Sequence, residues 1–419
     1  MQIAWQTELI YLMCRRGEIR MNYEILKEIR NGNFSFNRLA EYYPGLSILK
    51  DIPQNPEYHG EGDVYRHTEM VCEKLVTLPE WSGLKKEEQE LLFLAAAFHD
   101  IGKAYCTRME GKCGAFLKMP SDDMPPSGTK GQYQKEDGKW VSPRHTIIGE
   151  KEFRKIAYRE AAQFGLTFLQ RETVAKLIRY HGMPVWFWTK KRTEFDLLKA
   201  AESIPLRLLY LLSKADVQGR IAKEPEKISE NVELFADYAK ESGVWEKPYV
   251  FANPYTKYQY FHKEELWQDA ELYDDTEFDV ILMSGLPLAG KDSWILKNGM
   301  GMPIISLDGI REQLRIPPAK NSGKVVQTAM EQARDFLRRK EPFIWNATNI
   351  IQETRQKLIR LFAGYGARVH ILYLEVPYQE LLARNQKRTR YIPENVLEDM
   401  IRKLEIPAPW EAYEVKLFT

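Results

Sequence analysis

At 419 residues, the chain is too long for a single hydrophobic core of ordinary size, so two or three domains are expected. Hydrophobic residues make up 44% of the chain and charged residues 28%, which is typical of a soluble globular protein. The formal net charge of +1 excludes nucleic-acid binding through overall basic charge, so any such binding must come from local clusters.

Cysteine spacing and hydropathy both indicate a cytoplasmic protein. The cysteines are far apart and form no Cys-x-x-Cys pair, which is typical of free thiols in a reducing compartment. No apolar run approaches the roughly 18 residues that span a bilayer, and the N-terminus lacks the pattern of a signal peptide. We therefore expect no membrane partner. The cysteines are Cys14, Cys72, Cys106 and Cys113.

Residues 1–250 are expected to form a mostly helical domain. Apolar residues recur at helical spacing in the stretches 87–97, 171–179 and 206–214. The segment Lys118–Pro143 is rich in Pro, Gly, Ser and Asp, and this composition predicts a long surface loop.

A set of histidines and aspartates in this first domain indicates a metal centre. The pair His99-Asp100 ends an apolar helix, where two polar groups make sense as metal ligands and little sense as packing. Any one histidine alone is explained by an ordinary hydrogen bond, but the set together favours a metal site. Imidazole and carboxylate ligands suit divalent ions such as Mn, Fe, Co, Ni or Zn. The candidate ligands are His67, His99, Asp100, His145, His181 and Asp216.

Residues 251–278 form an aromatic and polar connector, which we expect to pack between domains; stacking of its rings on nucleic-acid bases is the alternative. After it, in residues 279–419, short β-rich runs alternate with helical segments. That alternation predicts a parallel sheet with crossover helices. The runs are 279–283, 303–306, 342–345 and 369–374.

The segment Gly285–Lys291 follows the first of these strands and has the glycine and lysine spacing of a phosphate-binding loop. Gly285 and Gly290 let the backbone N–H groups turn toward an anion, and Lys291 is expected to reach the β- and γ-phosphates. ATP or another NTP with Mg²⁺ is the expected ligand. Asp292 stands where Ser or Thr normally meets Mg²⁺, so either Asp292 or Ser293 makes this contact.

Polar residues after the next two strands indicate a site for a phosphate acceptor. Asp308 is placed to take a proton from an attacking hydroxyl, and Arg311 to hold an acceptor phosphate. The alternative is a helix cap at Asp308 and a surface arginine. Asn346 and Asn349 end the third strand and supply amides on the same face.

The segment Leu381–Arg390 is a basic helix and loop that includes Arg384 and Arg388. Beside a phosphate-binding loop, a lid that clamps phosphates during transfer is favoured over a merely solvated basic face.

Residues 50–225 resemble the HD phosphohydrolase superfamily, above all the HD domain attached to bacterial tRNA nucleotidyltransferases. The resemblance lies in Glu61–Thr68, His99–Lys103 and Ala215-Asp216. It implies one metal held by His67, His99, Asp100 and Asp216, and a second held by His145 and His181 with Asp100 bridging.

The same resemblance implies that Lys103 adds positive charge near a phosphate oxygen; a solvated surface lysine is the alternative. His59 is either a substrate contact or an ordinary loop residue.

The second half resembles the polynucleotide 5′-hydroxyl kinases in its phosphate loop, in Asp308 with Arg at +3, in its strand-end Asn/Thr segment and in its lid. This resemblance implies that Lys291 binds donor phosphates and that Asp308 is the general base. It also implies that Arg311 engages the phosphate next to the acceptor nucleoside, while Arg384 and Arg388 stabilise charge on the transferred group.

An HD domain ahead of such a kinase resembles the HD-Pnk family of bacterial end-healing enzymes over nearly the whole chain. This implies a kinase that phosphorylates 5′-OH ends and an HD domain that removes 2′,3′-cyclic or 2′-phosphates in RNA repair. The implied partners are RNA or DNA ends that carry these groups, with a separate RNA ligase acting next.

Three other hypotheses stay open. The first is a small-molecule nucleotide phosphohydrolase fused to a nucleoside or metabolite kinase. The second is an HD half that senses a nucleotide without turnover, which the complete His/Asp set disfavours. The third is a tRNA-processing enzyme related to the nucleotidyltransferases, although residues 1–50 are too short for a nucleotidyltransferase domain.

Overall fold

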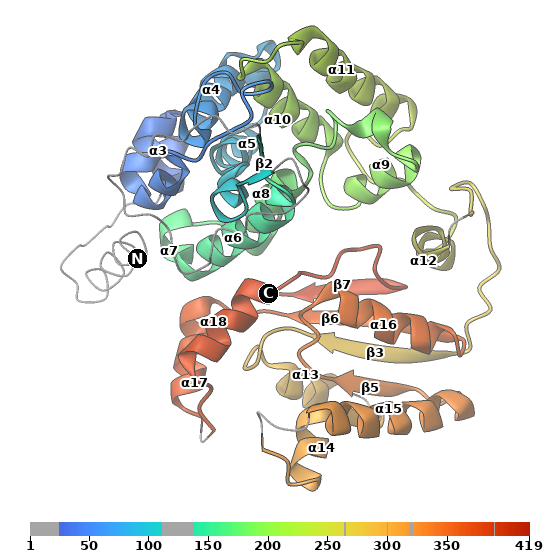
Figure 1. Cartoon of the computed structure of the whole chain (residues 1–419). Helices are drawn as coiled ribbons and strands as arrows, with labels where there is room; N and C mark the ends of the chain where they lie inside the picture. Colours follow the sequence, from blue (N-terminus) through green and yellow to red (C-terminus); the bar gives the residue numbers. More distant parts are fainter. Residues whose placement is uncertain (1–24, 111–137, 264, 300, 318–321, 389) are drawn as a thin grey trace. The chain divides into compact units, whose positions relative to one another are not determined.

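The computed structural model describes residues 25–110, 138–263, 265–299, 301–317, 322–388 and 390–419 (Figure 1). They form two compact units. The first comprises the described residues up to Thr193 together with Ile204–Lys247, and the second comprises Glu194–Ser203 and Pro248–Thr419. Among the helices of these described ranges, none is both long enough and apolar enough to cross a membrane.

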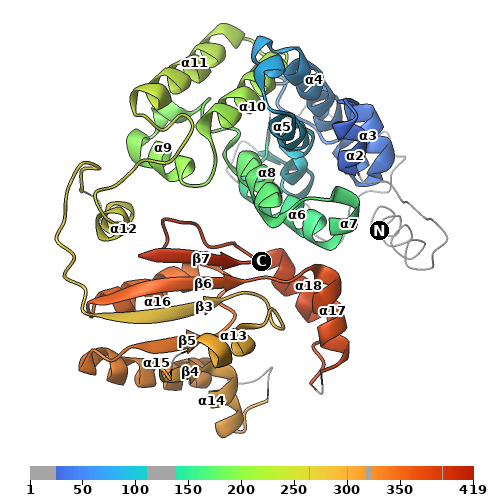
Figure 2. The ribbon, with the colours of Figure 1, turned by 180° about the vertical axis from the view of Figure 1, so that it is seen from behind.

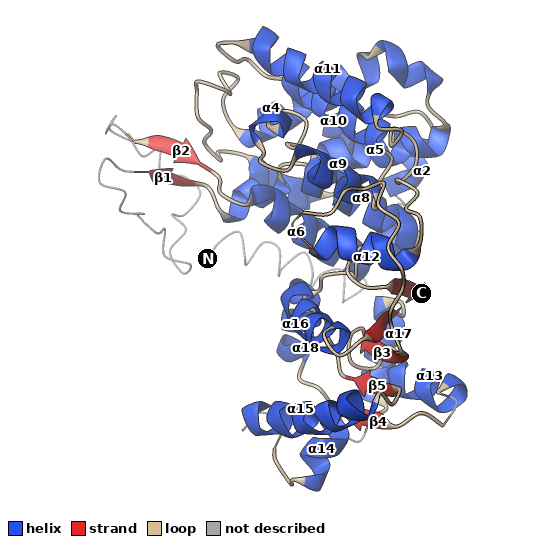
Figure 3. Ribbon diagram, turned by 90° about the vertical axis from the view of Figure 1, so that its right-hand side faces the viewer, coloured by secondary structure: helices blue, strands red, loops and turns tan. Residues whose placement is uncertain are grey.

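The first unit is helical apart from one short antiparallel pair, β1 (Arg108–Glu110) with β2 (Lys139–Val141), as Figure 3 shows. The helices expected at 87–97, 171–179 and 206–214 are confirmed. The helices of this unit are α2 (Ile25–Arg30), α3 (Phe36–Tyr42), α4 (Val64–Thr77), α5 (Lys86–Phe98), α6 (His145–Arg159), α7 (Ala161–Phe164), α8 (Phe168–Tyr180), α10 (Leu206–Gln218) and α11 (Pro225–Glu241), with 3-10 turns η1 (Pro44–Leu49), η2 (Pro79–Gly83), η3 (Ile101–Tyr105) and η4 (Phe187–Thr189).

Helix α5 lies at the centre of this unit because its sequence from Leu91 to Phe98 is wholly apolar. Its residues from Glu90 to Phe98 are all buried, and α4, α8 and α10 pack around it. The Glu88 carboxylate accepts the N–H of Lys85 at 3.1 Å and so caps its start. The helix therefore ends inside the protein, so the polar pair His99-Asp100 that follows it is also buried.

The predicted loop Lys118–Pro143 lies mostly outside the described residues, as do Cys14 and Cys113. One part of that prediction is corrected: Lys139–Val141 forms β2, because Trp and Val favour a strand where a partner such as β1 is available. Cys72 and Cys106 are free thiols.

The second unit is built on a parallel sheet with the strand order β4-β5-β3-β6-β7. The runs expected at 279–283, 303–306, 342–345 and 369–374 become β3 to β6. An additional edge strand, β7, was not predicted from the sequence. The strands are β3 (Phe278–Ser284), β4 (Ile304–Ser306), β5 (Phe343–Asn346), β6 (Ala367–Leu374) and β7 (Glu414–Phe418).

Helices cover both faces of this sheet, and Figures 1 and 2 show the two sides. Apolar residues of α12, α15 and α16 form one core with β3, β5 and β6, while α13 packs on the opposite face. The helices of this unit are α9 (Thr193–Ala201), α12 (Pro254–His262), α13 (Lys291–Asn298), α14 (Leu307–Gln313), α15 (Ser322–Arg339), α16 (Gln352–Ala363), α17 (Tyr378–Gln386) and α18 (Glu394–Lys403).

The segment 251–278 belongs to the second unit in the structure. Tyr258 of α12 joins the sheet core, and its neighbour Tyr260 packs 5.9 Å from the ring of Phe195 on α9. An ion pair between Lys257 and Glu202 adds to this contact. Tyr258 and Tyr260 are therefore used for packing inside this unit, whereas Trp267 and Tyr273 of the same segment are exposed.

Strand β3 occupies the centre of the sheet, where the strand order reverses. The chain leaves it toward β4 on one side and returns to β6 on the other. In open parallel sheets, ligands bind outside the carboxyl ends of the strands at such a reversal. The segment that follows β3 is therefore where this fold places a binding site.

Candidate metal centre and phosphate-binding loop

Three helices bring four of the metal-site candidates together in the first unit. His67 lies near the start of α4, His99 and Asp100 follow α5, and Asp216 lies in the last turn of α10. All four are at most 2% exposed. Nε2 of His67 lies 3.1 Å from Oδ1 of Asp216 and 3.4 Å from Nε2 of His99.

The other two histidines approach Asp100 from its other side. His145 begins α6 and His181 follows α8, and their Nε2 atoms lie 3.6 and 3.8 Å from Oδ1 of Asp100. The second oxygen of Asp100, Oδ2, lies 3.3 Å from Nε2 of His99. Asp100 thus faces both groups of histidines, the position in which the resemblance expects a bridging ligand.

Three of these rings are oriented by the main chain in the same way. In each, Nδ1 bonds to a carbonyl oxygen three residues earlier, and because a carbonyl only accepts, Nδ1 must carry the hydrogen. The Nε2 lone pair is then left for a cation. The pairs are His99 with Ala96 at 2.7 Å, His145 with Ser142 at 2.9 Å and His181 with Ile178 at 2.9 Å.

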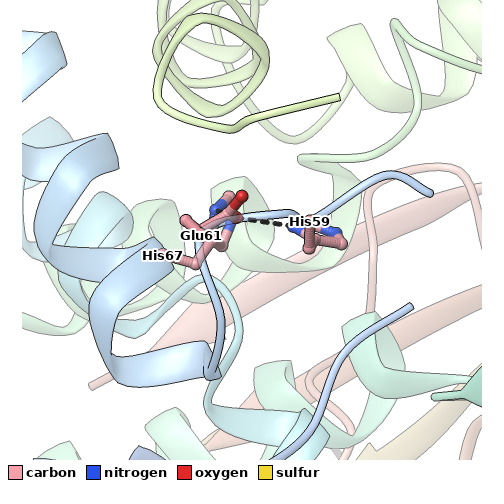
Figure 4. A group of neighbouring side chains, drawn as sticks. All are labelled: His59, Glu61 and His67. Atoms are coloured by element: carbon pink, nitrogen blue, oxygen red, sulfur yellow. Dashed lines mark hydrogen bonds and ion pairs between the residues drawn. The ribbon is translucent and has the colours of Figure 1, made fainter. Parts of the chain in front are cut away.

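His67 is oriented by a carboxylate instead. Its Nδ1 lies 2.8 Å from Oε1 of Glu61, and the same oxygen lies 2.9 Å from Nδ1 of His59 (Figure 4). The other oxygen of Glu61 accepts the N–H of Ile221 at 2.9 Å. Burial alone would raise the pKa of Glu61, but the hydrogen bonds from His59, His67 and Ile221 hold it well below its usual range.

Glu61 was not assigned a role from the sequence, although it lies within the motif that carries the resemblance. His59 lies in the same cluster, with its ring 4.6 Å from that of His67. Burial lowers the pKa of His59 to about 4, so the ring is neutral at pH 7.

Two cations contact the aspartates of the site. Lys103 is buried, with Nζ 2.7 Å from Oδ2 of Asp100 and bonded to Oε1 of Gln54 at 2.7 Å, which corrects the surface-lysine alternative. Arg220, which has no role in the sequence analysis, pairs with the Asp216 carboxylate, and its Nε donates to the Asp216 carbonyl at 3.1 Å.

These cations offset the effect of burial on the two carboxyls. Burial alone would raise the pKa of Asp100 and of Asp216. Lys103 and His99 hold the pKa of Asp100 well below its usual range, and Arg220 and His67 do the same for Asp216. Both are therefore ionised, the form that binds a metal.

The side chains fit divalent cations. Oδ1 of Asp100 is buried and accepts no hydrogen bond from any residue that the structure describes. Nε2 of His67 faces Nε2 of His99 at 3.4 Å, an approach of two lone-pair atoms that a shared cation favours. Imidazoles combined with carboxylates suit first-row transition ions.

In the second unit, the phosphate-binding loop runs from the end of β3 into α13. Gly285 has a φ of 137°, and a Cβ there would lie 2.3 Å from the carbonyl oxygen of Leu374. Gly290, with a φ of 99°, caps the start of α13. Nζ of Lys291 donates to the carbonyls of Gly285 at 3.0 Å and Leu286 at 2.8 Å, which holds the ammonium inside the loop.

Burial lowers the pKa of Lys291 to about 8, and several predicted site residues act on it. Asp292 and Asp308 raise this pKa, whereas Arg388 lowers it. The acceptor-site aspartate and a lid arginine therefore lie close enough to Lys291 to interact with it electrostatically. Arg388 itself is exposed.

Asp292 is held by the end of the neighbouring strand. Nδ2 of Asn346, the last residue of β5, donates to Oδ1 of Asp292 at 2.7 Å. Asp292 and Ser293 are both exposed at the start of α13. Of the two candidates for the Mg²⁺ contact, Asp292 is thus the one held in place by a partner.

Asn349 is engaged by the main chain. Its Nδ2 donates to the carbonyl of Met283 in β3 at 2.7 Å, and its own carbonyl accepts from Ser284 at 3.1 Å and Arg355 at 3.0 Å. The residue is 6% exposed and has a φ of 44°. These contacts hold the ends of β3 and β5 together. The side chain of Asn349 is thus bonded to the main chain, whereas that of Asn346 contacts Asp292.

The segment predicted to act as a lid contacts the phosphate loop. A guanidinium nitrogen of Arg384 in α17 donates to the carbonyl of Leu288 at 2.8 Å. Arg390 pairs with Glu312 of α14 at 2.6 Å, which links the lid to the helix that carries Asp308. Arg311 instead bonds to the carbonyl of Pro317 at 3.0 Å and to Ser322 at 3.2 Å.

Comparison with known proteins identifies a domain in each unit. A family model described as an HD domain matches residues 64–216, and one described as an AAA domain matches residues 280–407. The first match covers all six candidate metal ligands. The second covers the phosphate loop and the lid.

Two curated relatives each match part of the chain. It is 31% identical over 91 residues to the Multifunctional CCA protein of Hahella chejuensis, which covers 22% of this chain and 18% of that protein. It is 23% identical over 143 residues to the L-seryl-tRNA(Sec) kinase of Methanococcus maripaludis, which covers 32% of this chain and 56% of that protein. The chain thus spans less than two thirds of either relative. An HD domain followed by a P-loop, kinase-like domain with a five-stranded parallel sheet is present in one chain.

Proposed function

We propose that this chain is a bifunctional end-healing enzyme of the HD-Pnk type. Its kinase domain phosphorylates 5′-OH ends of nucleic acid with an NTP, and its HD domain removes 2′,3′-cyclic or 2′-phosphates. The observation that carries the proposal is the presence, in one chain, of a buried His/Asp centre and a phosphate loop with an aspartate nearby. A separate RNA ligase would join the healed ends.

In the HD domain, the chain's own residues hold and orient the reacting groups. Bound divalent ions would supply hydroxide and neutralise charge on the phosphate. Asp100 offers one oxygen to each group of histidines. Main-chain carbonyls orient three of the rings and Glu61 orients that of His67, so that Nε2 faces inward. Lys103 and Arg220 place positive charge beside the two aspartates, where a phosphate oxygen would bind.

In the kinase domain, Lys291 and the loop N–H groups would hold the β- and γ-phosphates of the donor. Asp308 would take the proton of the 5′-hydroxyl as its oxygen forms the new bond to phosphorus, and the nucleoside diphosphate leaves. Asp292, held by Asn346, is the favoured Mg²⁺ contact. Arg384 and Arg388 would stabilise charge on the transferred group.

The kinase relative is named for L-seryl-tRNA(Sec), an acceptor carried on RNA, and this supports a kinase that takes an RNA-bound substrate. The rival proposal, a metabolite kinase joined to a nucleotide phosphohydrolase, needs the same two centres but takes free nucleosides and nucleotides. Substrate size therefore separates the two proposals.

The test uses an oligoribonucleotide with a 5′-OH and a 2′,3′-cyclic phosphate. We would incubate it with the protein, ATP, Mg²⁺ and, in separate reactions, Mn, Co, Ni, Fe or Zn, and follow the products by mass spectrometry. We expect gain of a 5′-phosphate together with opening and loss of the cyclic phosphate. Turnover of free nucleosides and nucleotides with no change at either end of the oligonucleotide would overturn the proposal.

A further inference from the structure

The segment Met183–Arg192, which follows the candidate ligand His181, carries two exposed indole rings. Trp186 is 53% exposed and Trp188 44% exposed, whereas Phe187 between them is fully buried. Two open indole rings within three residues place more apolar surface together than a singly exposed side chain does. We call this segment the tryptophan platform.

Hydrogen bonds and packing fix the backbone of the platform. The N–H of Trp186 donates to the carbonyl of Met183 at 3.2 Å, and the carbonyl of Val185 accepts from Nδ2 of Asn231 at 3.1 Å. The Phe187 ring packs 5.2 Å from that of Phe235 on α11. The two indoles are therefore carried on a turn that is anchored to a helix.

One edge of the Trp188 ring also rests on α11, 5.6 Å from the ring of Tyr238, so Trp186 is the more exposed of the pair. A ring held on one side and open on the other loses little conformational freedom when a flat partner stacks on it.

Three exposed cations continue the platform: Lys190, Lys191 and Arg192. Two acidic groups on α11 have other partners: Asp237 accepts a hydrogen bond from Lys240 at 3.2 Å, and Glu233 accepts one from Tyr210 at 2.8 Å. The platform thus combines aromatic faces with local positive charge in a chain whose overall net charge is only +1.

The platform lies within reach of the candidate metal centre. Trp186 lies five positions after His181, a stretch that spans at most ~18 Å when fully extended and less in a turn. At about 3.4 Å per stacked nucleotide, that upper limit corresponds to roughly five nucleotides at most.

We propose that the tryptophan platform binds the single strand that leads to the phosphate end processed by the HD domain. This rests on the function proposed above and names its substrate class: an oligonucleotide several nucleotides long. Exposed aromatic rings beside basic side chains are the combination that holds single strands without sequence preference, with bases stacked on the rings and phosphates paired with the cations.

The test compares two substrates of the full-length protein with a transition metal present: an octanucleotide with a 2′,3′-cyclic phosphate and a nucleoside 2′,3′-cyclic phosphate. The readout is the ratio of kcat/KM for the octanucleotide to kcat/KM for the nucleoside. Trp186→Ala should lower this ratio about five- to a hundredfold, the range that loss of one stacked base predicts. Trp186→Phe should restore most of it.

A second measurement isolates the charges. In the double variant Lys190→Ala/Lys191→Ala, we would measure how the affinity for the octanucleotide depends on salt concentration. The slope of log affinity against log salt concentration should become shallower by about 1.4, since each phosphate contact on a single strand contributes about 0.7 to that slope. The matched control for Trp186→Ala is Trp267→Ala in the second unit, the same change at a tryptophan that is 78% exposed. It should leave the ratio of the two kcat/KM values unchanged.

The outcomes separate this inference from the proposed function. If the native protein opens neither cyclic substrate, the proposed function fails. If it opens the octanucleotide but Trp186→Ala leaves the ratio unchanged, the platform proposal is overturned. A change of oligomeric state in Trp186→Ala with an unchanged ratio would overturn it in favour of a protein interface.

Discussion

Oε1 of Glu61 lies 2.8 Å from Nδ1 of His67, whereas His99, on the other side of the candidate metal centre, bonds through Nδ1 to a main-chain carbonyl. A carboxylate in this position fixes the ring and raises the basicity of Nε2 more than a carbonyl does. Glu61 also accepts the N–H of Ile221, which follows Arg220. The carboxylate of Glu61 thus positions the candidate ligand His67. It also positions the segment that follows Arg220, one of the cations of the site.

Glu61→Ala should weaken divalent-metal binding about tenfold to a hundredfold, because loss of such a partner leaves the ring of His67 unfixed. Titration of the metal-free protein with Mn²⁺ by calorimetry measures this directly. The matched control is Glu57→Ala, a half-buried glutamate of the same loop whose carboxylate pairs with Lys139 at 3.6 Å. This variant should bind the metal as the native protein does. Equal affinity in Glu61→Ala and the control would show that Glu61 does not support the ligand.

Nucleotide binding should take up a proton in alkaline solution. Lysine is charged below its pKa, and burial lowers the pKa of Lys291 to about 8, so the free protein loses this proton as the pH rises past 8. A bound polyphosphate favours the charged form. At pH 9, calorimetric titration with ATP in two buffers of different ionisation enthalpy should therefore show uptake approaching one proton.

In Lys291→Arg the side chain stays charged throughout this range, so the proton uptake should disappear. If the heat of ATP binding to the native protein at pH 9 is the same in both buffers, the lowered pKa of Lys291 is contradicted.

The candidate ligands and the phosphate loop could be predicted from the sequence because each has a local signature. His99 and Asp100 interrupt an apolar run, and the glycines around Lys291 have a recognisable spacing. The runs that became β3 to β6 are strongly apolar and bounded by breaks, which made the parallel sheet predictable as well.

What the sequence could not reveal depends on contacts between distant segments. Glu61 and Ile221 are far apart in the chain, and nothing local to Arg220 indicates that it faces Asp216. Strand β7 escaped prediction because it lies at the sheet edge, where Leu417 and Phe418 stay partly exposed and the apolar pattern is weak.

Gly285→Ala should disable the kinase. The φ of 137° is strained for any residue with a side chain, and the added Cβ would lie 2.3 Å from a main-chain oxygen, so the loop must shift. We expect kcat/KM for 5′-phosphorylation to fall at least about tenfold, from strain of about 1–3 kcal/mol. Phosphatase activity should persist.

Gly323→Ala is the control for this change, since a Cβ there has open space around it. A kinase that tolerates Gly285→Ala as well as it tolerates Gly323→Ala would show that this loop does not bind the donor in the observed conformation.

The central claim is that one chain carries two independent phosphate-handling sites. The measurement that tests it most directly follows both ends of one 5′-OH, 2′,3′-cyclic-phosphate oligonucleotide in the Asp100→Ala and Asp308→Ala variants. Asp308→Ala should lose 5′-phosphorylation by about 10²–10⁴-fold and keep opening the cyclic end, and Asp100→Ala should do the reverse. Loss of both activities in either folded variant would contradict the account.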